Sequence, residues 1–205
     1  GVLGNLFARI GSGAMPFLLP LLMQLVMGFS PAQAGMLMLP VALASMATKR
    51  LVTRIITRWG YRRVLVTNTL LLGAMIAGFA LMTPEQPLLL RIVQMALFGA
   101  VNSMQFTAMN AVTLKDLAPA RAASGNSLFS MVQMLGMSLG VTCAAALLHA
   151  FTAWLQTGAG AEALPAFRAA LVLIGVMTMA SAAIFWQLDR GTPVRSSAAA
   201  AVDET

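Results

Sequence analysis

The feature that most constrains this chain is a series of five long stretches without a single charged residue. They cover residues 10–48, 64–84, 92–114, 122–161 and 169–188. A helix needs roughly 20 mostly apolar residues to cross the hydrocarbon core of a bilayer, and each stretch is at least that long. A chain with this pattern is predicted to be an all-α membrane protein.

The composition supports a membrane location and argues against nucleic-acid binding. Hydrophobic residues make up 59% of the chain and charged residues only 9%, whereas soluble domains carry about 25% charged residues. The net charge of +7 is concentrated in short gaps between apolar stretches and does not cover a folded surface. We therefore expect the lipid bilayer as a partner and no nucleic acid.

Two of the stretches are about twice the length of a single span. The first contains a turn signal at residues 30–35, Ser-Pro-Ala-Gln-Ala-Gly, so it holds two spans. The fourth holds one span followed by a polar loop at 156–165. The sequence thus predicts a six-helix transmembrane domain over residues 1–188 and a disordered tail over 189–205. The expected spans are 5–28, 34–56, 63–83, 88–113, 124–151 and 165–188.

The basic residues predict the orientation of these spans, because Lys and Arg accumulate on the cytoplasmic side. Six spans place the termini and the 49–63 and 114–123 loops on one side. That side collects Arg9, the six basic residues of 49–63, Lys115, Arg121, Arg190 and Arg195, whereas the other side has only Arg91 and Arg168. Both termini are therefore expected in the cytoplasm, with the protein in the cell inner membrane.

The basic block at 49–63 carries a recognisable pattern. Its second part reads Thr-x-x-x-Thr-Arg-Trp-Gly-Tyr-Arg-Arg. This resembles the G-x-x-x-D-R-x-G-x-R-R loop signature of the major facilitator superfamily. The matching residues are Arg58, Gly60, Arg62 and Arg63. Thr53 and Thr57 stand where the signature has Gly and Asp, a loss typical of the weaker copy in the second half of such transporters.

Two further stretches narrow the resemblance. One begins at Arg9-Ile-Gly-Ser-Gly and continues through Pro16, Pro20, Gln24, Gly28, Ser30-Pro31, Ala34-Gly35 and Pro40. The other comprises Asn110, Thr113-Leu-Lys-Asp-Leu117, Ser124-Gly-Asn-Ser-Leu128 and Gly140-Val141. In this order they resemble the C-terminal half of the 14-spanner (EmrB/QacA) drug:proton antiporters, close to the MdtD-type exporters.

The resemblance implies a specific role and a partner. The chain would be the C-terminal six-helix bundle of a multidrug efflux transporter that exports amphipathic, drug-like organic compounds by alternating access. An N-terminal half of six or eight helices would be missing from this chain. The chain starts Gly-Val-Leu-Gly without an initiator Met, which favours a fragment or trimmed chain.

The signature arginines of the basic block allow two interpretations. Arg58, Arg62 and Arg63 can bind helix C-terminal carbonyls, anionic lipid heads or an acid on a neighbouring helix, and Gly60 permits the turn between spans. In the family this loop acts as a conformational latch. Alternatively, the arginines only hold this side of the protein in the cytoplasm.

Uncharged polar residues inside the spans are the candidates for a substrate cavity. On the fourth span, Gln94, Asn102 and Gln105 fall within an arc of about 80° at 100° per residue, and Phe98 and Met109 share this arc. Gln24 on the first span and Gln133 on the fifth are similar candidates. The alternative is that these amides form hydrogen bonds between helices.

Acidic residues are absent from every expected span, and Glu85, Asp116, Glu162 and Asp189 all fall in loops or the tail. Proton-coupled antiport needs a group that gains and loses a proton within the membrane, so the coupling acid is expected in the missing half. The sequence contains no metal-ligand cluster and no catalytic or phosphate-binding motif, so no cofactor, metal or enzyme activity is expected. Two alternatives stay open: a homodimeric six-helix transporter, and an accessory or truncated protein that does not transport.

Overall fold

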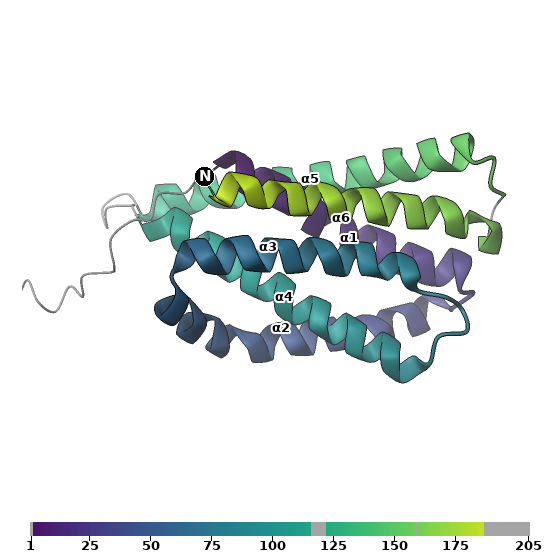
Figure 1. The fold of residues 1–205 in the computed structure, drawn as a ribbon, viewed down its shortest axis with the longest axis horizontal. Coiled ribbons are helices and arrows are strands. Elements are labelled where there is room, and N and C mark those ends of the chain that lie inside the picture. The colour runs from purple at the N-terminus through teal and green to yellow at the C-terminus, as the bar shows by residue number, and fades with distance from the viewer. Residues whose placement is uncertain (1, 116–121, 159, 187–205) are drawn as a thin grey trace, which may run out of the picture.

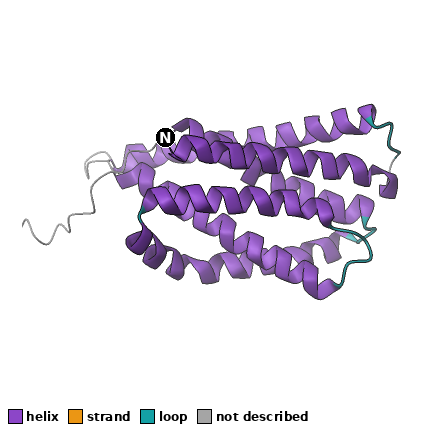
Figure 2. Cartoon of the chain, in the orientation of Figure 1, coloured by secondary structure: helices purple, strands orange, loops and turns teal. Residues whose placement is uncertain are grey.

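A computed structural model describes residues 2–115, 122–158 and 160–186, and within them the structure is helical, with no strand (Figures 1 and 2). The N-terminus and the α2–α3 connection lie at one end of the bundle, and the α1–α2, α3–α4 and α5–α6 connections at the other (Figure 1). Six of the described helices are long and apolar enough to cross a membrane. The elements are α1 (Val2–Leu21), η1 (Leu22–Val26), α2 (Pro31–Trp59), α3 (Tyr61–Gly78), η2 (Phe79–Leu81), α4 (Leu88–Lys115), α5 (Ala122–Trp154), η4 (Gly160–Ala163) and α6 (Leu164–Trp186).

The first span changes geometry towards its end. Pro16 and Pro20 lie inside α1 without ending it, and the chain then widens into the π-helix η1 at residues 22–26. Proline removes a backbone donor and crowds the preceding turn, and π-turns inside membrane helices accommodate such defects. The departure from regular α-helix thus lies in the turn that follows Pro20.

The second span is longer than the sequence pattern suggests. It begins at Pro31, because Ser30 and Gln33 form a reciprocal capping box: the Ser30 hydroxyl accepts from the Gln33 amide at 3.3 Å and the Gln33 side chain accepts from the Ser30 amide at 2.9 Å. It then continues through Lys49 to Trp59. The basic block is therefore mostly helical, and only Gly60 separates α2 from α3.

Three helix pairs form the main contacts of the bundle, namely α3 with α6, α2 with α4, and α1 with α5. Each pair has a glycine at its point of closest approach. Gly73 and Gly175 face each other between α3 and α6, such that a Cβ on either would lie 2.6 Å from the carbonyl oxygen of the other. Small residues at these points let helix backbones approach closely, which is how membrane helices gain packing energy.

The α2–α4 pair shows the same principle with added hydrogen bonds. A Cβ at Gly99 would collide with the backbone of Val41. Beside this contact, the Ser45 hydroxyl donates to the Gly99 carbonyl and the Ser103 hydroxyl donates to the Ser45 carbonyl, both at 2.9 Å. Close approach and hydroxyl bonding thus occur at the same crossing.

The Gly99 crossing leads to a test with a matched control. Gly99→Ala should destabilise the domain by about 1–3 kcal/mol, because a backbone has to move to admit the methyl group. Gly35→Ala, on the same pair of helices, meets nothing within 4 Å and should be neutral or slightly stabilising, because alanine favours helix. The melting temperature in detergent can be followed by reaction of a thiol dye with Cys143, the only cysteine. Equal melting temperatures for the two variants would contradict the close packing at Gly99.

Candidate functional site

The candidate residues of α4, Gln94, Phe98, Asn102, Gln105 and Met109, form a stripe along the helix. This α4 polar stripe faces α3 at its centre. Asn68 of α3 donates from Nδ2 to Gln105 Oε1 at 2.8 Å and to the Val101 carbonyl at 3.0 Å. Gln105 in turn donates from Nε2 to the Thr69 hydroxyl at 2.7 Å. All three side chains are buried. In this structure the Gln105 amide is therefore engaged in bonding α4 to α3.

The part of the stripe nearer the start of α4 also contacts the segment that follows α3. Phe98 is buried and packs edge-on against Phe79 of η2, with ring centroids 5.5 Å apart at 77°. Gln94 is half-buried and accepts a long hydrogen bond of 3.4 Å from Gln86 in the α3–α4 connection. These two residues lie on the same side of α4 as Gln105.

Two amide oxygens at the centre of the domain have unused hydrogen-bonding capacity. The Asn68 and Asn102 Oδ1 atoms are buried and have no hydrogen-bond partner among the described residues. The side chain of Asn102 is otherwise half-buried. Met109, the last candidate on α4, is buried, and its sulfur lies 3.4 Å from Gln105 Nε2. Asn102 is thus the member of the stripe that combines a partly accessible side chain with a buried acceptor oxygen that no described residue engages.

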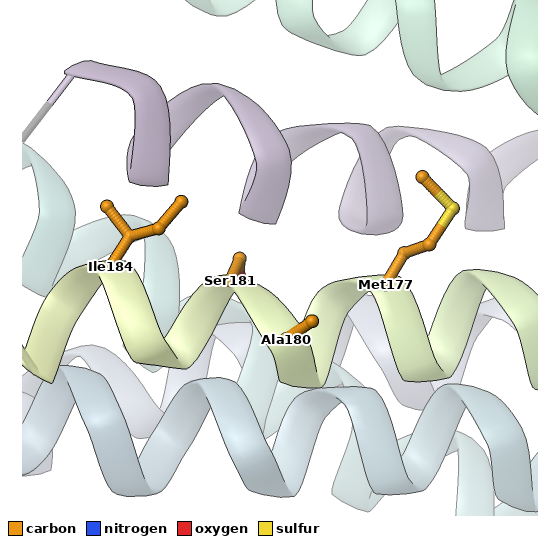
Figure 3. Close-up of a pocket in the computed structure, with 4 residues that line it drawn as sticks. All are labelled: Met177, Ala180, Ser181 and Ile184. Atoms are coloured by element: carbon orange, nitrogen blue, oxygen red, sulfur yellow. The ribbon is translucent and has the colours of Figure 1, made fainter.

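The two candidates on other spans are both half-buried. Gln24 lies in the π-turn η1, and Gln133 lies on α5. Gln24, Gln133 and the α4 stripe thus lie on three different helical segments. An apolar hollow of about 230 Å³ lies elsewhere, and its described lining residues Met177, Ala180, Ser181 and Ile184 all come from α6, facing α1 (Figure 3). None of the predicted site residues lines it.

The signature residues of the basic block sit at one helix junction. Gly60 has φ +79°, a left-handed conformation that favours glycine. This conformation lets the chain turn from α2 into α3. Arg58 and Arg63 are exposed, whereas Arg62 is half-buried and lies over the Trp186 ring of α6, with Cζ 5.1 Å from the centroid. Arg62 thus joins the start of α3 to the end of α6.

Two buried arginines were not among the predicted site residues: Arg9 was used to count charges and as the start of a stretch that resembles the family, and Arg91 only to count charges. Arg9 of α1 is 1% exposed, donates from Nη2 to Asn110 Oδ1 at 3.2 Å, and lies over the Phe106 ring at 4.9 Å. Arg91 of α4 is 4% exposed and donates to the carbonyls of Thr83 and Pro84 at 2.9 and 2.7 Å. Both sit in otherwise apolar sequence, which is the signal that could have singled them out.

Comparison with known proteins identifies relatives for most of the chain. A profile of the Major Facilitator Superfamily matches residues 2–203. Two relatives are named "Putative multidrug resistance protein MdtD". The one from Pectobacterium atrosepticum is 50% identical to this chain over 152 residues, and the one from Serratia proteamaculans is 48% identical over 151 residues. Each match covers 74% of this chain. The match covers 33% and 32% of those proteins, so the chain spans about a third of the length of the curated relatives it matches.

The Asn68–Gln105 bond can be tested by a double-mutant cycle. Asn68→Leu or Gln105→Leu alone should each cost about 1–3 kcal/mol of stability, because each leaves a buried polar partner unsatisfied. The double variant should cost clearly less than the sum of the two, since the partners are then removed together. Gln133→Leu, a half-buried glutamine on α5, serves as the control and should change the melting temperature little. Additive losses would show that the two amides do not interact.

Proposed function

The chain belongs to the Major Facilitator Superfamily, and we propose that it is the C-terminal six-helix half of a multidrug efflux transporter. The observation that carries this proposal is the uneven burial of its six spans. Only 11% of the α2 span and 17% of the α5 span are buried, against 39–61% for the other four. In a membrane such exposed helix faces are covered either by lipid or by a further protein surface.

The chemistry of the exposed α5 face favours a protein partner over lipid. Ser138, Thr142 and His149 are exposed there, on the same face as Met131 and Leu135. By contrast, the exposed face of α6 carries aliphatic residues such as Val172 and Val176. Polar groups avoid direct contact with lipid tails and face a bundle interior or a cavity.

The exposed α2 face has the spacing of a helix–helix seam. Met36, Leu39, Leu43 and Met46 are all exposed and follow one another at intervals of three and four residues, the repeat by which helices interlock side chains. We propose that α2 and α5 together dock a second half of six or eight helices. Substrate would bind between the halves near the bilayer midplane, with access alternating by rocking.

The relatives' names suggest the substrate class. By extension from them, the ligands would be amphipathic, drug-like organic compounds, and Asn102, Gln24 and Gln133 would offer the hydrogen bonds of this half. The described helices α1–α6 contain no Asp or Glu. Proton antiport would therefore depend on an acidic residue of the other half.

The tryptophans support the proposed limits of the spans, and the basic block supports their orientation in the inner membrane. Trp59 and Trp186 are exposed at the end of the bundle that carries the basic block, and Trp154 is exposed at the opposite end. Tryptophan prefers the membrane–water interface and basic residues prefer the cytoplasmic side. The end that carries Gly60 would thus face the cytoplasm.

Complementation tests the function directly. Expression of this chain together with the N-terminal half of a matching MdtD-type relative should restore export of a fluorescent drug from cells that lack their own exporters, while each half alone should not. Export by this chain alone, with a cross-linked homodimer, would contradict the proposal and favour a homodimeric transporter.

The role of the basic block can be separated from topology by two charge-matched variants. Arg62→Gln/Arg63→Gln should lower the export rate at least several-fold in the complemented transporter, since it removes the two signature arginines and the contact with Trp186. Lys49→Gln/Arg54→Gln removes the same charge from the same membrane side but touches no signature residue, and should retain export. Equal losses, or a failure of both variants to insert, would indicate a purely topological role.

A further inference from the structure

The helices α1 and α4 are held together in an unusual way. Among the described residues, the close helical neighbours of α1 are α5 and α6, and those of α4 are α2 and α3. The α1–α4 pair has no extensive backbone approach comparable to the glycine crossings. The hydrogen bond and the cation–π contacts that link the two segments are made by the side chains of two arginines.

One arginine bridges each end of this pair. At the inner end, Arg9 extends from α1 to Phe106 and Asn110 of α4. At the outer end, Arg91 extends from α4 to Phe29, just beyond η1, with Cζ 5.2 Å from the ring centroid. Each helix thus supplies an arginine near its own start, and each arginine stacks on an aromatic ring near the far end of the other helix.

The surroundings of Arg91 restrain its guanidinium at one nitrogen atom, whereas its buried Nε atom has no hydrogen-bond partner among the described residues. The side chain is buried, and its Nη2 atom is shared between two consecutive carbonyls of the α3–α4 connection. A buried cation is tolerated only where hydrogen bonds and polarisable groups replace its water. Since a planar guanidinium can stack on a ring while it donates within its plane, moving Phe29 away would expose the cation to a less favourable environment.

We propose that Arg9 and Arg91 set the separation of α1 and α4, and that they are positioning residues for ligand binding between these helices. Gln24 belongs to the first of these helical segments and Asn102 to the second. The part of the proposal that concerns ligand binding rests on the proposed transport function. The separation itself does not, because it is a property of this chain alone.

Spin-label distances test the separation without any ligand. With Cys143→Ser as background, labels at Leu25 and Val93, which are 50% and 45% exposed, report on the outer end of the pair. Arg91→Gln should broaden this distance distribution or shift it by about 1–2 Å, the size of typical helix displacements. Labels at Leu43 and Leu97 on the α2–α4 pair, which is held by the Gly99 crossing, should give an unchanged distribution.

Three further variants sharpen the test. Phe29→Leu should broaden or shift the Leu25–Val93 distance distribution as Arg91→Gln does. Phe29→Tyr keeps the aromatic ring and should leave the distribution as narrow as in the wild type. Arg168→Gln removes an exposed arginine from the start of α6 and should change neither pair. Unchanged Leu25–Val93 distances in both Arg91→Gln and Phe29→Leu would overturn the proposal, as would equal broadening of both label pairs, which would indicate general loosening.

Drug export in the complemented transporter then tests the link to binding. Arg91→Gln should raise the KM for the drug several-fold while the maximal rate changes less, because the binding geometry and not the rocking step is altered. An altered distance with an unchanged KM would overturn the role in ligand binding. A wild-type pair of halves that does not export would instead contradict the proposed function and leave the distance result standing.

Discussion

The structure depends on how closely its helix backbones can approach one another. In a bilayer, lipid tails are as apolar as leucine side chains, so burial of apolar surface alone does not drive helices together. The bundle solves this with glycine crossings at the α3–α6, α2–α4 and α1–α5 pairs. Around these fixed points, hydroxyls and amides such as Ser45, Ser103 and Asn68 form hydrogen bonds between helices.

The same constraint explains where the domain is less tightly packed. The α1 helix ends in a π-turn after Pro20, and its connection to α4 is made by arginine side chains stacked on aromatic rings. Helix pairs joined by long side chains can change their separation more readily than pairs in backbone contact. A ligand that has to be bound and released within the membrane would be served by such an adjustable pair beside rigid ones.

The sequence predicts the number and type of spans well because hydropathy and length alone decide which segments can cross a bilayer. The start of α2 could not be placed by apolar content, because the Ser30–Gln33 capping box extends the helix into polar residues. Helical spacing groups Gln94, Phe98, Asn102 and Gln105 on one side of α4. It cannot say which neighbour that side faces, and the structure shows α3 and η2. The partners of Arg9 could not be predicted from the sequence either, because Asn110 is 101 residues away along the chain and is not an acid.

The central claim is that α2 and α5 dock a second half of a transporter. The test uses single-cysteine variants in a Cys143→Ser background, Leu43→Cys on α2 and Ser138→Cys on α5. Each variant is co-expressed with the N-terminal half of an MdtD-type relative and cross-linked to it in membranes. Val172→Cys, on the exposed aliphatic face of α6, is the control. The account predicts cross-links between the halves from Leu43 and Ser138 and none from Val172. Equal cross-linking from all three positions, or cross-links only between copies of this chain, would contradict it.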